Sequence, residues 1–198
     1  MIAGLRGTLL MARLAERFSN ATIVAFGVVM TGFAALVTFE TLARKFMNIS
    51  LQGVDELGGY VLAVTSSLAF TLALLDRAHI RIDLFHLKVP LGLRAILNWI
   101  SAAMTTAFAA LLVYVGIIVL RETIDFGSTA PTPWATPLVW PQSLWLAALV
   151  IFLLAAVAHF FAATRLLAAG RVGELDRRHG PKGAEEEVQE ELADLERR

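Results

Sequence analysis

Four long apolar stretches, separated by short polar segments, dominate the pattern of the chain. No Asp, Glu, Lys or Arg occurs in residues 21–39, 57–75, 95–120 or 143–164. An α-helix rises about 1.5 Å per residue, so about 20 apolar residues cross the ~30 Å hydrocarbon core of a bilayer. The pattern predicts an all-α membrane protein whose transmembrane domain, residues 19–168, has spans at about 21–42, 57–76, 95–120 and 143–165.

The segment before the first apolar stretch, residues 1–18, has a mixed pattern. Apolar residues alternate at roughly helical spacing with basic and acidic ones: Leu5, Leu9, Met11, Leu14 and Phe18 with Arg6, Arg13, Glu16 and Arg17. This favours an amphipathic helix lying on the membrane surface, with a frayed tail as the alternative. Ser19 and Asn20 are preferred N-cap residues, so we expect the first span to begin after them.

Charged residues mark the ends of the spans, because a charged side chain in hydrocarbon is costly. Glu40 and Arg44 are four residues apart, which predicts a helical ion pair. Asp55 and Glu56 fall where the second span begins, and carboxylates are favoured at the positive end of a helix dipole. After the second span come the basic residues Arg77, Arg81 and Lys88, for which a solvated basic rim is the favoured interpretation and a bound lipid headgroup the alternative.

The loop of residues 127–142 is rich in proline and tryptophan. It contains Pro131, Pro133, Pro137 and Pro141 together with Trp134 and Trp140. The prolines predict extended backbone without helix, and the tryptophans suit the headgroup layer. Cations are more numerous on the opposite side, in the N-terminal arm and after the second span. The positive-inside rule therefore predicts that both termini and the segment around His79 lie in the cytoplasm.

Residues 169–198 form a charged tail in which carboxylates outnumber cations. Glycines and a proline break it as far as Gly183, and residues 184–198 then read as a charged helix. Its apolar stripe of Val188, Leu192 and Leu195 could dock on a partner, although a solvated, partly disordered tail is the favoured interpretation.

Composition narrows the possible functions. Hydrophobic residues make up 57% of the chain and charged residues 17%, and the absence of Cys excludes disulfides and thiol chemistry. A transporter that moves a polar solute needs polar groups or broken helices at mid-membrane. The spans have no charge near their centres and no internal proline, so a scaffold or accessory subunit is favoured. We find no catalytic or phosphate-binding motif and expect no enzyme activity and no nucleic-acid binding.

A haem-binding electron-transfer subunit is the alternative from another functional class, since membrane helix bundles can hold haem between histidines. The chain has four: His79, His86, His159 and His179. Of these, His159 is the one inside a predicted span, so a facing pair of histidines is hard to form. A membrane adaptor that acts alone is the third hypothesis.

Several short motifs point to a family. They are RKF at Arg44–Phe46, Asp55-Glu56-Leu57 with Tyr60 at the start of the second span, and AHIRIDLF at Ala78–Phe85, followed by Pro90 and Arg94. With the four spans, this pattern resembles the DctQ-type small membrane subunit of the tripartite ATP-independent periplasmic (TRAP) transporters. The resemblance covers roughly residues 19–165.

The resemblance implies an accessory subunit in the bacterial inner membrane. Its partners would be a large DctM-type membrane subunit, which carries the substrate and sodium sites, and a periplasmic solute-binding protein that delivers an organic acid or similar solute. The chain would be the stationary scaffold, surrounded by lipid, with no cofactor, metal, catalytic or substrate site of its own. Eight motif residues would have architectural roles: Arg44, Glu56, Tyr60, His79, Arg81, Asp83, Pro90 and Arg94.

Overall fold

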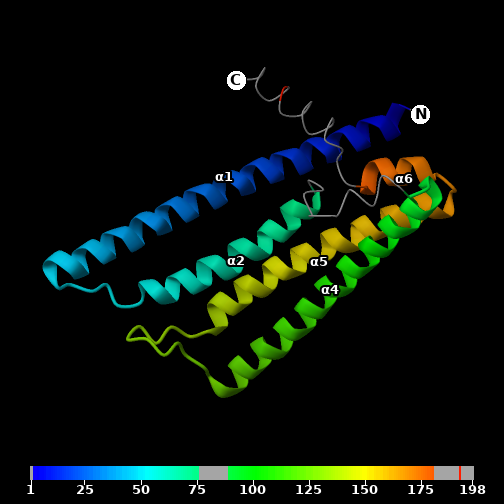
Figure 1. Ribbon diagram of the computed structural model, residues 1–198. Coiled ribbons are helices and arrows are strands. Elements are labelled where there is room, and N and C mark those ends of the chain that lie inside the picture. Colours follow the sequence, from blue (N-terminus) through cyan, green and yellow to red (C-terminus); the bar gives the residue numbers. More distant parts are fainter. Residues whose placement is uncertain (1, 76–88, 181–191, 193–198) are drawn as a thin grey trace. The chain divides into compact units, whose positions relative to one another are not determined.

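The computed structural model describes residues 2–75, 89–180 and 192, with backbone alone for residues 2–23. The chain folds into α-helices in the order α1 Ile2–Met47, α2 Val54–Leu75, α4 Leu91–Phe126, α5 Val139–Ala168 and α6 Val172–His179 (Figure 1). Four segments are long and apolar enough to cross a membrane: Val24–Met47, α2, α4 and α5. The prediction of an all-α membrane protein with four such helices is confirmed.

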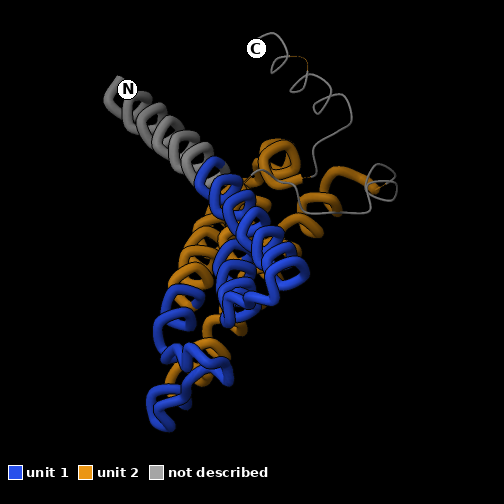
Figure 2. Tube along the Cα trace, turned by 90° about the vertical axis from the view of Figure 1, so that its left-hand side faces the viewer, with its two compact units in different colours: residues 1–66, 122–145 blue, residues 67–121, 146–198 orange. Residues whose placement is uncertain are grey.

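The chain divides into two compact units (Figure 2). Unit 1 contains residues 1–66 and 122–145, and unit 2 contains residues 67–121 and 146–198. Unit 1 therefore holds α1, the first half of α2 and the proline-rich loop. Unit 2 holds the end of α2, most of α4 and α5, and α6.

In unit 1, α1 and α2 approach closely at a glycine. A Cβ atom at Gly58 would lie 2.8 Å from Cζ of Phe33, so only glycine fits against this ring without a shift. The proline-rich loop then folds back on itself: the backbone N–H of Ala130 donates to the carbonyl of Thr136 at 2.9 Å. Unit 1 is thus held by close contacts near α2 and by a compact loop.

In unit 2, α4 and α5 pack along a seam made almost entirely of alanines. The seam residues recur every seventh position, which keeps them on one helix face: Ala95, Ala102 and Ala109 on α4, and Leu149, Ala156 and Ala163 on α5, all at most 2% exposed. Small side chains let transmembrane helices approach closely. Across the seam, the Thr106 hydroxyl donates to the backbone carbonyl of Ala156 at 3.0 Å. Leu74 of α2 and Phe152 complete this core.

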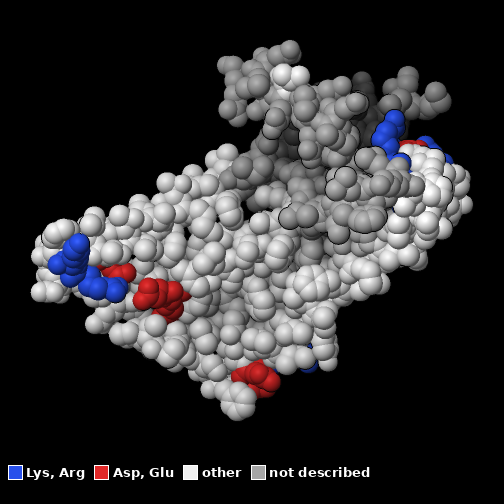
Figure 3. Space-filling model, viewed as in Figure 1, with Lys and Arg blue, Asp and Glu red and all other residues white. Residues whose placement is uncertain are grey.

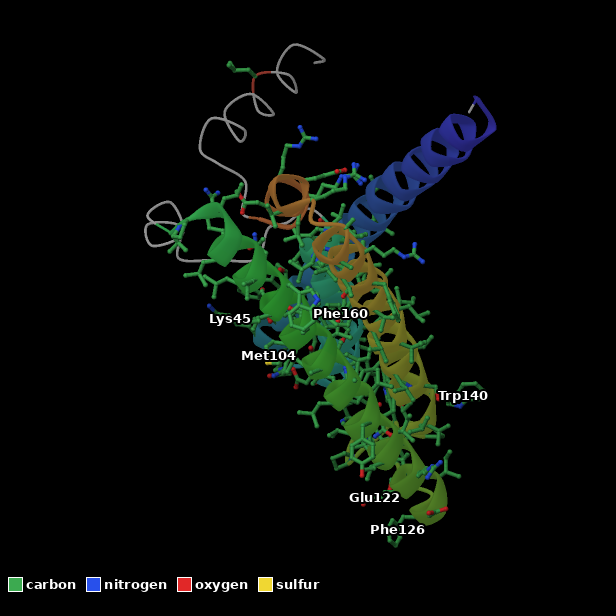
Figure 4. The ribbon with its side chains drawn as sticks, turned by 90° about the vertical axis from the view of Figure 1, so that its right-hand side faces the viewer. Lys45, Met104, Glu122, Phe126, Trp140 and Phe160 are labelled. Carbon is green, nitrogen blue, oxygen red and sulfur yellow. The ribbon has the colours of Figure 1, made fainter. Side chains whose placement is uncertain are left out.

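Apolar side chains are also abundant on the surface, as expected in lipid. Phe126 at the end of α4 is 82% exposed and Trp140 in the first turn of α5 is 71% exposed. Both point away from their helices (Figure 4). On the face shown in Figure 3, the described charged residues form a few separate patches and the rest of the described surface is uncharged.

Two predictions at the helix ends are wrong. α1 continues through Ser19 and Asn20, so neither residue caps a separate helix. No Gly or Pro occurs between Gly7 and Gly27 to interrupt it. Pro141 is likewise helical, because α5 begins at Val139. In the first turn of a helix, the missing N–H of proline would have had no partner, so proline is tolerated there. The surface location of residues 1–18 stays a prediction.

The tail is more ordered than we expected. Residues 172–179, which the charge pattern assigned to a broken and solvated segment, form α6, and Leu175 is fully buried. The predicted helix of residues 184–198 lies outside the described residues, except for Leu192. The segment from Asp76 to Lys88, with the rim of Arg77, Arg81 and Lys88, also lies outside them.

Candidate functional site

In unit 1, Glu56 connects the start of α2 to the proline-rich loop. One carboxylate oxygen accepts a hydrogen bond from the hydroxyl of Thr132 in the loop. The other accepts one from the hydroxyl of Tyr60, one turn further along α2, at 2.7 Å. Because both oxygens are engaged, the carboxylate holds the loop in one position beside the helix. This is the position that the sequence assigned to a favourable helix-dipole interaction, and the acidic first turn is confirmed.

A glycine and a tryptophan make a second contact between the same two segments. Gly53, just before α2, has φ of 105°, a conformation that L side chains rarely adopt. A Cβ atom there would lie 2.5 Å from Cδ2 of Trp134 in the loop. The glycine is therefore required both for the turn and for the stacking of the indole. The Trp134 side chain remains half exposed.

The end of α1 carries the predicted ion pair. Arg44 contacts the carboxylate of Glu40 one turn earlier, as the i,i+4 spacing indicated. Glu40 is 4% exposed, and the Ser50 hydroxyl lies 3.3 Å from the same carboxylate oxygen. The pair thus neutralises a buried carboxylate near the end of a span.

In unit 2, α6 is fixed to the first turns of α4 by polar contacts. Arg94 of α4 forms an ion pair of 2.6 Å with Asp176 of α6. The amide of Asn98, one turn later and 2% exposed, donates to the other carboxylate oxygen of Asp176 at 3.0 Å. The carbonyl of Pro90 accepts the backbone N–H groups of Leu93 and Arg94 at the start of α4. These contacts hold α6 against the start of α4.

A pair of histidines links α6 to α5. Nδ1 of His179 lies 2.9 Å from Nε2 of His159, and the ring centroids are 4.2 Å apart. We expected a facing pair of histidines that could hold haem to be hard to form; His159 does have a histidine partner, because α6 folds back along the last turns of α5. The signal in the sequence was the spacing of Leu175, Asp176 and His179, which places all three on one face of a short helix.

The histidine pair does not favour the haem alternative. A metal–imidazole bond is about 2 Å long, so two axial nitrogens around one iron lie about 4 Å apart. At 2.9 Å the two ring nitrogens share a proton with no space for a metal between them. Among the residues that the structure describes, no group of three or more His, Asp or Glu side chains could hold a metal ion.

The family-motif residues fall in different places. Glu56 and Tyr60 contact each other in unit 1, and Arg44 is in the same unit at the end of α1. Pro90 and Arg94 are in unit 2. His79, Arg81 and Asp83 lie outside the described residues. Each described motif residue makes a contact near a helix end. The architectural roles that the family resemblance implies for these residues stay predictions. Sequence reasoning missed Thr132, Asn98, Asp176 and the histidine pair.

The comparisons with known proteins agree with the helix pattern. No curated protein matches the chain. The sequence model of the family described as "Tripartite ATP-independent periplasmic transporters, DctQ component" matches residues 33–166, which include α2, α4 and nearly all of α5. This match extends over more than half of the chain and includes every motif on which the resemblance rested. The chain therefore belongs to the DctQ family and is a multi-pass small permease subunit of a TRAP transporter.

Proposed function

We propose that this small permease subunit is a stationary scaffold for a large DctM-type membrane subunit and contributes no solute pathway of its own. The observation that carries the proposal is the chemistry inside the spans. Their uncharged runs contain hydroxyl and small residues, and the hydroxyl of Thr106 is used to join α4 to α5. Such contacts fix helices against one another, whereas a route for a polar solute needs charged groups or broken helices at mid-membrane.

The remaining parts of the proposal follow from the family resemblance. A periplasmic solute-binding protein delivers an organic acid or similar solute to the outer face. The large subunit then imports the solute together with sodium ions, in the bacterial inner membrane. Both termini of the chain lie in the cytoplasm, so the proline-rich loop and Glu56 are near the periplasmic face. The excess of cations on the side of the termini supports this orientation.

Reconstitution into liposomes tests the proposal. We expect sodium-dependent uptake of solute when this chain, the large subunit and the binding protein are present together, and none with this chain alone. Uptake by liposomes that contain this chain alone would contradict the scaffold role. Uptake by the large subunit and binding protein at an unchanged rate without this chain would also contradict it.

The orientation has a separate test, because the chain has no cysteine. Single cysteines at Thr129, in the proline-rich loop, and at Gly173, in α6, can be labelled in intact cells with a maleimide that does not cross the inner membrane. We expect labelling at Thr129, and labelling at Gly173 only after the cells are opened. The reverse pattern would place the termini outside.

A further inference from the structure

The contact between His159 and His179 has a property that the scaffold role does not require. We propose that this pair is an acid-sensitive latch, which holds α6 against α5 when at least one imidazole is neutral and releases it when both are protonated. The proposal rests on the geometry of the pair and of the groups around it in unit 2.

The distance between the two ring nitrogens limits how many of the two rings can be protonated to imidazolium while α6 is docked. At 2.9 Å, Nδ1 of His179 and Nε2 of His159 make a hydrogen bond in which one nitrogen donates and the other accepts. Two neutral rings satisfy this arrangement, and so do one imidazolium and one neutral ring. Two imidazolium rings do not, because both nitrogens then carry a hydrogen and neither has a free lone pair.

The position of the pair makes separation the favoured response to a second proton. His179 is 5% exposed, and the ring centroids are 4.2 Å apart, so two positive charges would repel each other with little water between them. α5 continues for nine residues after His159, whereas α6 ends at His179. The short α6 is therefore the element that can leave, and its release exposes both rings to water.

The described charged residues near the pair are mostly cations. On α6, Glu174 forms ion pairs with Arg171 and Arg178, and Arg177 follows Asp176. On α4, Arg94 pairs with Asp176. On α5, the nearest charged residue along the chain is Arg165, and residues 67–75 of α2 contain no titratable group. No described carboxylate near the pair is without a cation to stabilise a second imidazolium.

The sign of the pH dependence follows from proton binding. The docked state contains at most one imidazolium ring, whereas the released state can contain two. The released state therefore binds more protons, and acid favours release. Since an ordinary histidine has a pKa of about 6.5, the ratio of released to docked α6 rises up to about tenfold per pH unit below that value. The released fraction of α6 is therefore small at neutral pH and increases progressively as the pH falls from about 6.5 to 5, against the contacts of Asp176 that also hold α6.

Spin-label distances in the full chain, reconstituted in lipid nanodiscs, test the latch. Gly92 at the start of α4 and Gly173 in α6 are both exposed, and a Cβ atom added at either has no heavy atom within 4 Å. The double variant Gly92→Cys, Gly173→Cys therefore accepts labels without disturbing the packing. We expect one short distance at pH 8 and a growing population at longer distance from pH 6.5 to pH 5. An unchanged distribution at pH 5 would overturn the proposal.

Two substitutions separate the histidine pair from other titrating groups. His179→Gln keeps a polar side chain that does not titrate, and we expect its distance distribution to stay constant from pH 8 to pH 5. His86→Gln is the matched control and keeps the response of the parent protein. If Asp176 were responsible, the response would persist in His179→Gln and disappear in Asp176→Asn, and this result would contradict the latch.

A measurement without substitution of the pair covers the case in which His179→Gln fails to dock. Ring nitrogen-15 NMR of histidine-labelled protein distinguishes neutral imidazole from imidazolium. We expect the two rings to become imidazolium together only over the pH range in which the label distance lengthens. Two imidazolium rings in a protein whose α6 is still docked would overturn the proposal.

Discussion

The two units hold their helix ends together by different means. In unit 1, the start of α2 and the proline-rich loop are joined by the hydrogen bond from the Thr132 hydroxyl to the Glu56 carboxylate and by the Trp134 indole against Gly53. In unit 2, the start of α4 is joined to α6 by an ion pair and a buried amide, and α5 is joined to α6 by a histidine pair. Contacts of the first kind do not depend on a proton near neutral pH, whereas the histidine pair does. With the proposed latch, the contacts between helix ends in unit 1 are independent of pH near neutrality, and the contact between α5 and α6 in unit 2 depends on it.

The largest effect is expected at Asp176. Asp176→Ala removes the carboxylate that the buried amide of Asn98 and the guanidinium of Arg94 share, which costs about 3 kcal/mol. We expect trypsin to cleave α6 at Arg177 and Arg178 about a hundredfold faster, because cleavage follows the population of open α6. Asp176→Asn, which keeps an oxygen for Asn98, is the control and has a smaller effect. Equal cleavage rates in all three proteins would show that these contacts do not hold α6.

The next effect is expected at Gly53. Gly53→Ala places a methyl group against the indole of Trp134 and forces alanine into a positive φ, at a cost of about 2 kcal/mol. Gly59→Ala is the matched control. Gly59 is inside α2 with open space at its Cβ position, and alanine there is stabilising by about 0.5–1 kcal/mol. Thermal unfolding in detergent should therefore shift in opposite directions. A shift in the same direction would mean that Trp134 does not pack on Gly53.

A smaller effect is expected in the loop. Thr132→Val removes the hydroxyl that donates to Glu56, so the backbone amides of residues 128–138 should exchange about three to tenfold faster with deuterium. Thr129→Val, at an exposed position of the same loop, should leave exchange unchanged. If both variants behaved alike, Glu56 would not be the group that holds the loop.

The smallest effect is expected at the end of α1. Arg44 is more than half exposed, and ion pairs with an exposed partner contribute little to stability. Arg44→Gln should lower the unfolding temperature only slightly, since the buried Glu40 carboxylate loses its cation but keeps the Ser50 hydroxyl. A large loss of stability would place Arg44 among the main supports of unit 1.

Much of the fold could be predicted from the sequence, because spans follow from uncharged length alone. The family followed from short motifs, and the ion pair of Glu40 and Arg44 followed from local spacing. The contacts missed are those between residues far apart in the chain: Thr132 with Glu56, and Asp176 with Asn98, are separated by 76 and 78 positions. The charge of the tail was also misleading, since the hydrophilic residues of α6 conceal the buried Leu175.

The alanine seam of α4 and α5 has a mechanical consequence. Helices that meet along methyl groups have almost no slack, and a slide of α4 by one residue in one direction would bring Arg94, Ser101 and Phe108 into the seam in place of its alanines. The match returns only after seven residues, a travel of about 10 Å. The two helices therefore behave as a single rod over the length of the seam. Such a rod suits the proposed scaffold role, because a neighbouring subunit can move along it without bending it.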